Sequence, residues 1–176
     1  MKQSSIIILL TLLMSMISPK ALAYDIEVNN IYYNWINDKS ELSVCSEKGA
    51  YSGKVVVIPE SVEYEGKTYT VTEIEQGAFS GCTKLESIEI PNSVISIGGS
   101  AFSGTAWFKN QPNGVVYAGK VAYKYKGTMP QNTEITLDNG TLGIAAHAFY
   151  DCKNLISMNM PNGVISIGDY AFSGCI

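Results

Sequence analysis

The sequence predicts a mostly β protein whose coils, each about 23 residues long, stack into a solenoid with short helical or 3₁₀ turns. Two observations carry this prediction: an internal repeat of constant length, and an alternating apolar pattern inside each repeat. A third observation, an export signal ahead of the repeats, places the protein outside the cytoplasm.

The first 23 residues have the order of a cleaved secretory signal peptide. Lys2 gives a positive start, an apolar run extends from Ile6 to Ile17, and Ala21-Leu22-Ala23 ends the segment. The run is shorter than the roughly 20 residues that span a bilayer. We therefore expect export with cleavage after Ala23, and no membrane span in the mature chain. That chain, residues 24–176, carries 10 Lys and 16 acidic residues, a net charge of −6.

An Ala-Phe pair recurs along the rest of the chain. It begins at residues 78, 101, 148 and 171, so that the steps are 23, 47 and 23 residues. The middle step equals one coil with an insertion of 24 residues, or two coils plus one residue. A second block, Leu-x-x-Ile/Met-x-Ile/Met-Pro-Asn, keeps the same register at residues 85–92 and 155–162. Two independent blocks in one register indicate a structural repeat.

Each coil has a physical interpretation. The Leu-x-x-Ile-x-Ile block is a strand with alternate residues pointing inward, and Pro-Asn ends it with a turn. Val-x-x-Ile starts the return path, and Gly-x-x-Ala-Phe is long enough for only one helical or 3₁₀ turn. A single coil cannot cover its own apolar face, so the coils must stack. We expect a continuous core that contains a column of Phe79, Phe102, Phe149 and Phe172.

The string Ala-Phe-x-Gly-Cys-x-x-Leu-x-Ser-Ile-x-Ile-Pro-Asn-Ser-Val-x-Ser-Ile-Gly, which begins at Ala78, strongly resembles the BspA-like leucine-rich repeats of bacterial surface proteins. The resemblance covers residues 71–104 and 132–176 closely. It implies a curved leucine-rich-repeat solenoid on a secreted or surface-attached protein. Some members of that family bind host matrix proteins or other cells, and this property is implied here only as an expectation.

Two segments fall outside the repeat. Residues 24–70 alternate strand and turn patterns, and we expect them to form a β-rich N-terminal cap over the edge of the first coil. The insertion, about residues 105–131, holds Val115–Tyr117 and Val121–Tyr125 around a turn at Ala118-Gly119, which predicts a β-hairpin. The solenoid would span residues 71–176. It stops in mid-repeat, so we expect an uncapped C-terminal end, open to self-association, in a chain that can be a fragment of a longer protein.

Alternation along the second hairpin strand separates two faces. Lys120, Lys124 and Lys126 fall on one face, and Val121, Tyr123 and Tyr125 fall on the other. We expect the lysine face to be the solvated side. The alternative is a small basic patch for an acidic glycan.

The residue types that catalysis and metal binding need are sparse. His147 is the only histidine, and it has no Cys or carboxylate partner at metal-ligand spacing. No nucleophile-base motif or paired carboxylate motif is evident. We therefore expect no enzymatic activity, no metal and no cofactor. All twelve basic residues are Lys in an acidic chain, which argues against a nucleic-acid partner.

Three of the four cysteines share one repeat position: Cys82, Cys152 and Cys175. Parallel side chains on neighbouring coils lie slightly too far apart for an unstrained bridge. We expect buried thiols that act as small apolar residues. A disulfide between Cys152 and Cys175 is the alternative.

The favoured function is that of a binding or adhesion module for a protein or cell-surface ligand, with host matrix proteins among the candidates. The candidate site is the outward face of the strands, Ser87, Glu89, Glu134, Thr136, Ser157 and Asn159. The alternatives are a glycan-binding protein that uses Trp107, Tyr117 and Tyr125 of the insertion, or a structural part of a longer surface protein. In each case we expect an exported protein, secreted or on the cell surface.

Overall fold

A computed structural model describes residues 24–46 and 51–175 of the chain. The predicted signal peptide, residues 1–23, lies outside the described residues. Within them the chain is mostly β with almost no helix. The elements are β1 (Ile26–Val28), β2 (Ile31–Ile36), β3 (Glu41–Cys45), β4 (Val55–Val57), β5 (Ser61–Tyr64), β6 (Lys67–Ile74), β7 (Ser87–Glu89), β8 (Ser96–Ile97), α1 (Ala106–Lys109), β9 (Gly114–Ala118), β10 (Val121–Lys126), β11 (Thr133–Thr136), β12 (Gly143–Ile144), β13 (Leu155–Asn159) and β14 (Ser166–Ile167).

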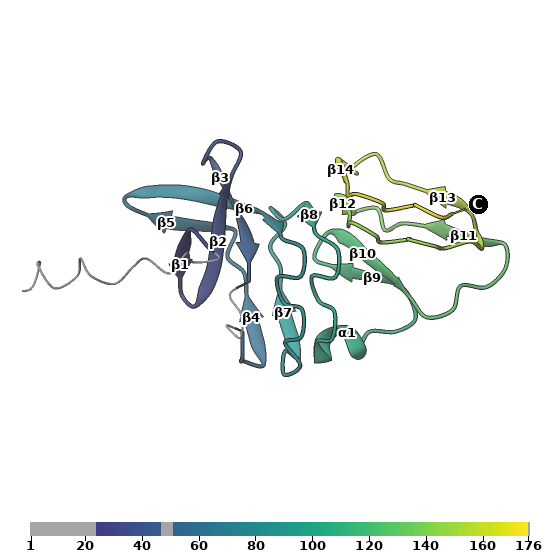
Figure 1. Ribbon diagram of the computed structural model, residues 1–176. Helices are drawn as coiled ribbons and strands as arrows, with labels where there is room; N and C mark the ends of the chain where they lie inside the picture. The colour runs from purple at the N-terminus through teal and green to yellow at the C-terminus, as the bar shows by residue number, and fades with distance from the viewer. Residues whose placement is uncertain (1–23, 47–50, 176) are drawn as a thin grey trace, which may run out of the picture.

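The coils lie one after another along the molecule, from the N-terminal strands to β14 (Figure 1). Two sets of parallel strands connect them. On one side β4 pairs with β7, and β11 pairs with β13. On the return side β6 pairs with β8, and β12 pairs with β14. On either side of the insertion, neighbouring coils therefore bond to each other through short parallel ladders.

The N-terminal strands join this arrangement directly. β1, β2 and β3 form an antiparallel meander, and β3 then pairs in parallel with β6, opposite Val71 and Ile74. β5 folds back on β6 as a hairpin. Because β3 lies beside β6, it covers the return-side edge of the first coil.

The Ala-Phe segments form isolated hydrogen-bonded turns and no continuous helix. In the first segment the N–H of Ala78 donates to the Glu75 carbonyl and the N–H of Ser80 to the Gly77 carbonyl, which closes isolated turns. The residue before each Ala has a positive φ, from 55° at Tyr170 to 68° at Gly77. That left-handed residue interrupts any right-handed helical path. The helix α1 lies in the insertion instead, where the Thr105 side chain accepts from the Phe108 N–H and caps it.

The predicted column of Phe residues is confirmed in the core. Phe79 and Phe102 stack at 5.5 Å between ring centroids, and Phe149 and Phe172 stack at 5.4 Å. Phe79, Phe102 and Phe149 are fully buried. Phe172, on the last described coil, is half-buried.

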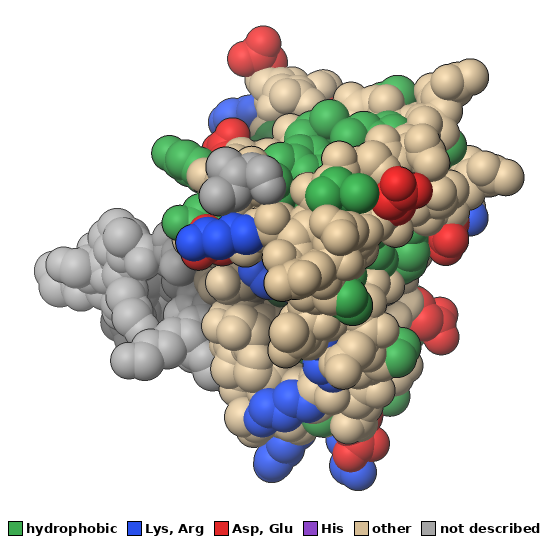
Figure 2. Space-filling model, turned by 90° about the vertical axis from the view of Figure 1, so that its right-hand side faces the viewer, with side chains coloured by type: hydrophobic (Ala, Val, Ile, Leu, Met, Phe, Trp, Pro, Cys, Tyr) green, Lys and Arg blue, Asp and Glu red, His purple; other side chains and the backbone are tan. Residues whose placement is uncertain are grey.

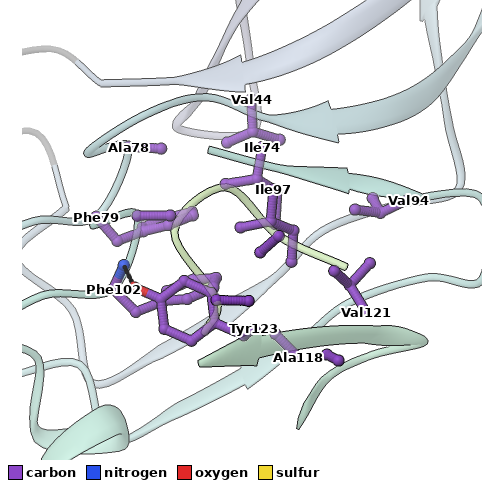
Figure 3. Close-up of a cluster of buried hydrophobic side chains, with 14 of the residues drawn as sticks. Val44, Ile74, Ala78, Phe79, Val94, Ile97, Phe102, Ala118, Val121 and Tyr123 are labelled. Carbon is purple, nitrogen blue, oxygen red and sulfur yellow. Dashed lines mark hydrogen bonds between the residues drawn. The ribbon is translucent and has the colours of Figure 1, made fainter. Parts of the chain in front are cut away.

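Tyr123 of β10 fills the column at the insertion. Its ring meets Phe102 edge-on at 5.1 Å, and its hydroxyl oxygen accepts from the Phe102 N–H at 3.1 Å (Figure 3). In the other coils the Phe N–H donates to the Ala carbonyl of the next coil, as from Phe79 to Ala101 at 2.8 Å. The insertion displaces that next coil, and the Tyr123 hydroxyl supplies the acceptor in its place.

β9 and β10 form an antiparallel hairpin, and β10 also pairs in parallel with β12. A register shift between Ala122 and Lys124 breaks the alternation, so Val121, Ala122 and Tyr123 are all buried. The expected separation of the hairpin into two faces by simple alternation is therefore wrong.

Two of the three hairpin lysines bind main-chain oxygens. The Lys124 ammonium donates to the His147 carbonyl at 3.0 Å. The Lys126 ammonium donates to the carbonyls of Phe108, Lys109 and Gln111, at the C-terminal end of α1. The interpretation of this face as a merely solvated one is wrong for these two lysines, because main-chain oxygens hold their ammonium groups.

Candidate binding surfaces

The six predicted strand-face residues are all exposed, but they lie on two separate surfaces. Ser87 and Glu89 lie on β7, beside β4. The other four lie on β11 and β13. The place beside β7 where the next strand would pair is taken by α1, since the Trp107 N–H donates to the Leu85 carbonyl at 2.6 Å. The insertion thus divides the strand face into two patches.

The patch on β11 and β13 is small and polar. Glu134 lies opposite Ser157, and Thr136 lies opposite Asn159. The Asn159 amide donates to the Thr136 hydroxyl at 3.2 Å. Aromatic and Arg anchors usually carry the energy of an interface, and these four side chains supply none.

The patch on β4 and β7 differs because it is partly apolar. Val55 and Val57 are 60% and 53% exposed, and they lie opposite Ser87 and Glu89. Sequence reasoning missed both valines, although their alignment with the repeat was available. Val55-Val-Val-Ile-Pro aligns with Ser87-Ile-Glu-Ile-Pro, which places the first and third residues outward.

The aromatic residues proposed for a glycan are used in packing. The Trp107 ring meets Phe102 at 4.8 Å, and both Tyr117 and Tyr125 are only partly exposed. The Tyr117 hydroxyl oxygen accepts from the Asp138 N–H at 2.9 Å. These contacts leave the insertion little free aromatic surface on which a sugar ring could stack.

A cleft of about 440 Å³ crosses the return side of the coils. Its lining includes Glu73, His147, Asp169 and Tyr170. The His147 ring stacks on Tyr170 at 5.3 Å, and 66% of the Tyr170 surface is exposed. Burial, and then the charge of Glu75, raise the pKa of Glu73. No pattern in the sequence indicated this cleft, because its residues come from coils on both sides of the insertion.

The thiols at the shared repeat position are free and half-buried: Cys82, Cys152 and Cys175. Burial raises the pKa of Cys82. Burial and then the neighbouring Cys175 raise that of Cys152. The Cys175 thiol donates to the Phe149 carbonyl at 3.2 Å. Raised pKa values keep Cys82 and Cys152 protonated and weakly nucleophilic at neutral pH.

Over residues 24–46 and 51–175, no three His, Cys, Asp or Glu side chains gather as a metal ion would require. The one helix in that part of the chain, α1, is too short to cross a bilayer.

Stacked parallel strands, turns that repeat Ala-Phe and a shared Phe column define a β repeat protein with exposed strand faces. The model of the BspA type leucine rich repeat region matches residues 60–176 in six copies. The chain therefore belongs to this family. No curated protein matches it.

Solved structures of leucine-rich repeat proteins are also similar. One from Bacteroides ovatus is 27% identical, with a TM-score of 0.39, over 86% of this chain and 45% of its own. One from T. pallidum is 22% identical, with a TM-score of 0.41, over 86% of this chain and 68% of its own. A leucine rich cell surface protein from Faecalibacterium prausnitzii is 16% identical, with a TM-score of 0.40, over 85% of this chain and 46% of its own. The chain spans less than half the length of the Bacteroides ovatus protein.

Proposed function

We propose that the protein is an exported or cell-surface binding module that takes a protein ligand on the outward face of β4 and β7. Family membership supports a repeat protein that binds, and the signal-like N-terminus supports export. The observation that carries the location is the pair Val55 and Val57. Each exposes more than half of its surface, and the two lie opposite Ser87 and Glu89 of β7.

Exposed apolar side chains on a rigid strand pair are suited to a protein partner. Burying a Val side chain contributes about 1.5–3 kcal/mol. Ser87 and Glu89 beside the valines provide hydrogen-bond acceptors at the rim. The Lys54–Glu86 ion pair, 2.9 Å long and exposed, adds charges of both signs at one end of the strands. The four predicted residues of β11 and β13 offer only polar contacts, and the exposed apolar side chain on these strands is Ile156.

The test is binding of the chain 24–176 to immobilised fibronectin, fibrinogen and intact cells, measured by surface plasmon resonance and cell pull-down. Val57→Lys places a charge in the centre of the proposed patch, and we expect it to weaken binding at least about tenfold. Thr136→Lys introduces the same charge on the other strand face, and we expect it to leave affinity unchanged. No binding to any of these surfaces by folded protein would contradict the proposed function. Loss with Thr136→Lys alone would move the site to β11 and β13.

A further inference from the structure

The outer edge of β4 is an open strand edge. Beside β7, the Ser87 N–H donates to the Lys54 carbonyl at 3.1 Å and the Ile58 N–H donates to the Glu89 carbonyl at 3.0 Å. In a parallel pair, alternate residues direct their main-chain groups to the same neighbour. The ladder with β7 therefore uses Val56, and Val55 and Val57 direct their N–H and C=O groups to the opposite edge. No strand in residues 24–46 or 51–175 pairs with that edge.

The open edge contrasts with the return side of the same coil, where β3 covers β6. Natural proteins usually blunt a free edge with a Lys, a Pro or a bulge inside the strand. β4 consists of three valines in regular register with β7. Nothing in the side chains or the main chain of β4 thus prevents another strand from pairing with this edge.

A groove of about 550 Å³ runs along this edge. The three residues of β4 line it, and so do the Asn29-Asn30 turn and the first two residues of β2. Tyr51 also lines the groove, and its hydroxyl group makes two hydrogen bonds. It accepts from the Tyr32 N–H at 3.0 Å and donates to the Cys45 carbonyl at 2.9 Å. Tyr51 is therefore tied to β2 and β3 before any ligand arrives.

We propose that the edge of β4 binds an extended segment of a partner protein, which adds to β4 as a further strand inside this groove. The main chain of Val55 and Val57 supplies the hydrogen bonds, and the groove receives alternate side chains of the segment. The place to be filled continues the parallel stacking that β4 and β7 already show. This inference rests on the proposed function and deepens it, because it assigns the kind of partner and its mode of binding.

The first measurement is amide hydrogen exchange by NMR. In the free protein we expect slow exchange at Val56, whose amide bonds to β7, and fast exchange at Val55 and Val57. The probe is a synthetic nonapeptide that copies residues 84–92, because that segment already forms the strand on the other side of β4. On saturation we expect exchange at Val55 and Val57 to slow at least about tenfold, with Val56 unchanged. Unchanged exchange at Val55 and Val57 would overturn the proposal.

Two N-methylated versions of the peptide test strand pairing without altering the protein. One carries methyl groups on the amides that correspond to Ser87 and Glu89, and the other on those of Ile88 and Ile90. Only alternate amides of an added strand face β4. We expect one version to lose binding at least about tenfold and the other to bind within about threefold of the parent. Equal behaviour of the two versions would contradict strand addition.

A matched pair of protein variants completes the test. Val57→Pro removes an N–H that does not bond to β7, which an edge strand tolerates. Val57→Thr keeps the N–H and the branched side chain. We expect the Pro variant to bind the peptide at least about tenfold more weakly and the Thr variant to bind nearly as well. If a ligand from the earlier assay is lost with Val57→Lys but retained with Val57→Pro, the proposed function stands and strand addition fails. Protection of Val55 and Val57 in a dimer without peptide, detected by light scattering, would also overturn the proposal, since a second copy would then fill the edge.

Discussion

Tyr123 joins the two halves of the core through one hydroxyl group. Its ring lies beside Phe102, and its oxygen accepts the Phe102 N–H that would otherwise face the insertion without an acceptor. The site is almost fully buried, which also raises the pKa of the Tyr123 hydroxyl, so the group stays a neutral hydrogen-bonding partner. A buried main-chain N–H without an acceptor costs stability because no water can replace the bond.

We therefore expect Tyr123→Phe to lower the free energy of unfolding by about 1–3 kcal/mol, since it leaves the ring and removes the acceptor. Urea denaturation followed by circular dichroism measures the change. Tyr117→Phe is the matched control, because the Tyr117 hydroxyl also accepts from a main-chain N–H, that of Asp138, but at an exposed position. Its effect should be smaller, about 0.5 kcal/mol. Equal losses in the two variants would contradict the role assigned to burial.

At the scale of elements, contact between coils explains why the repeat keeps Gly98. A Cβ atom at Gly98 would lie 2.2 Å from the main-chain nitrogen of Gln76 in the preceding coil. The equivalent residue after the insertion is Ala145, where β10 replaces the preceding coil and the Ala145 N–H donates to Ala122 at 3.0 Å. A side chain is thus accepted at this repeat position only where the neighbouring backbone is different.

Gly98→Ala should destabilise the protein by about 3 kcal/mol, because one of two packed backbones must move. Gly163→Ala is its control: the added Cβ would lie 3.4 Å from the Thr141 carbonyl oxygen, close to ordinary contact. Thermal unfolding of both variants separates the two effects. A Gly98→Ala variant as stable as Gly163→Ala would show that the coils are packed less closely than the structure has them.

The elements that the sequence predicted best are those that repeat. The Phe column follows from spacing alone, because a stack of equal coils places equivalent residues above one another. The register of β10 could not be predicted, because strand alternation assumes a regular pairing and the shift after Ala122 depends on the pairing with β9. The sequence places Lys126 in solvent for a related reason: nothing local reveals that α1 ends beside it. The apolar patch at Val55 and Val57 was within reach of an alignment with the repeat. The open edge beside it was not, since an edge is a property of the assembled sheet.

At the scale of the whole molecule, the two ends of the stack differ. On its return side the first coil is covered by β3. The last described coil carries large exposed hydrophobic residues: Ile156, Met160, Ile165, Ile167 and Tyr170. Figure 2 faces this end of the molecule and shows hydrophobic side chains on its surface. Among the described strands, β13 and β14 each pair on one edge only. Apolar surface and open ladders together favour contact with another chain.

We expect the chain 24–176 to self-associate through this end. The difference between the two ends predicts whether the product is a dimer or a filament. Because β3 blocks the return side of the first coil, complete coils cannot stack head to tail into a filament. When two copies meet through β14, each contributes the same surface, and the contact is complete in a closed dimer. Light scattering over a range of concentrations should show a mass that reaches twice the monomer and rises no further.

Ile167→Lys should shift the equilibrium toward monomer by at least about tenfold, because it buries a charge in that contact. Thr136→Lys, which adds the same charge on an outward strand face, should leave it unchanged. Monomers at every concentration would contradict self-association, and masses that grow without limit would show that the open edge of β4 has joined the contact and made it head to tail.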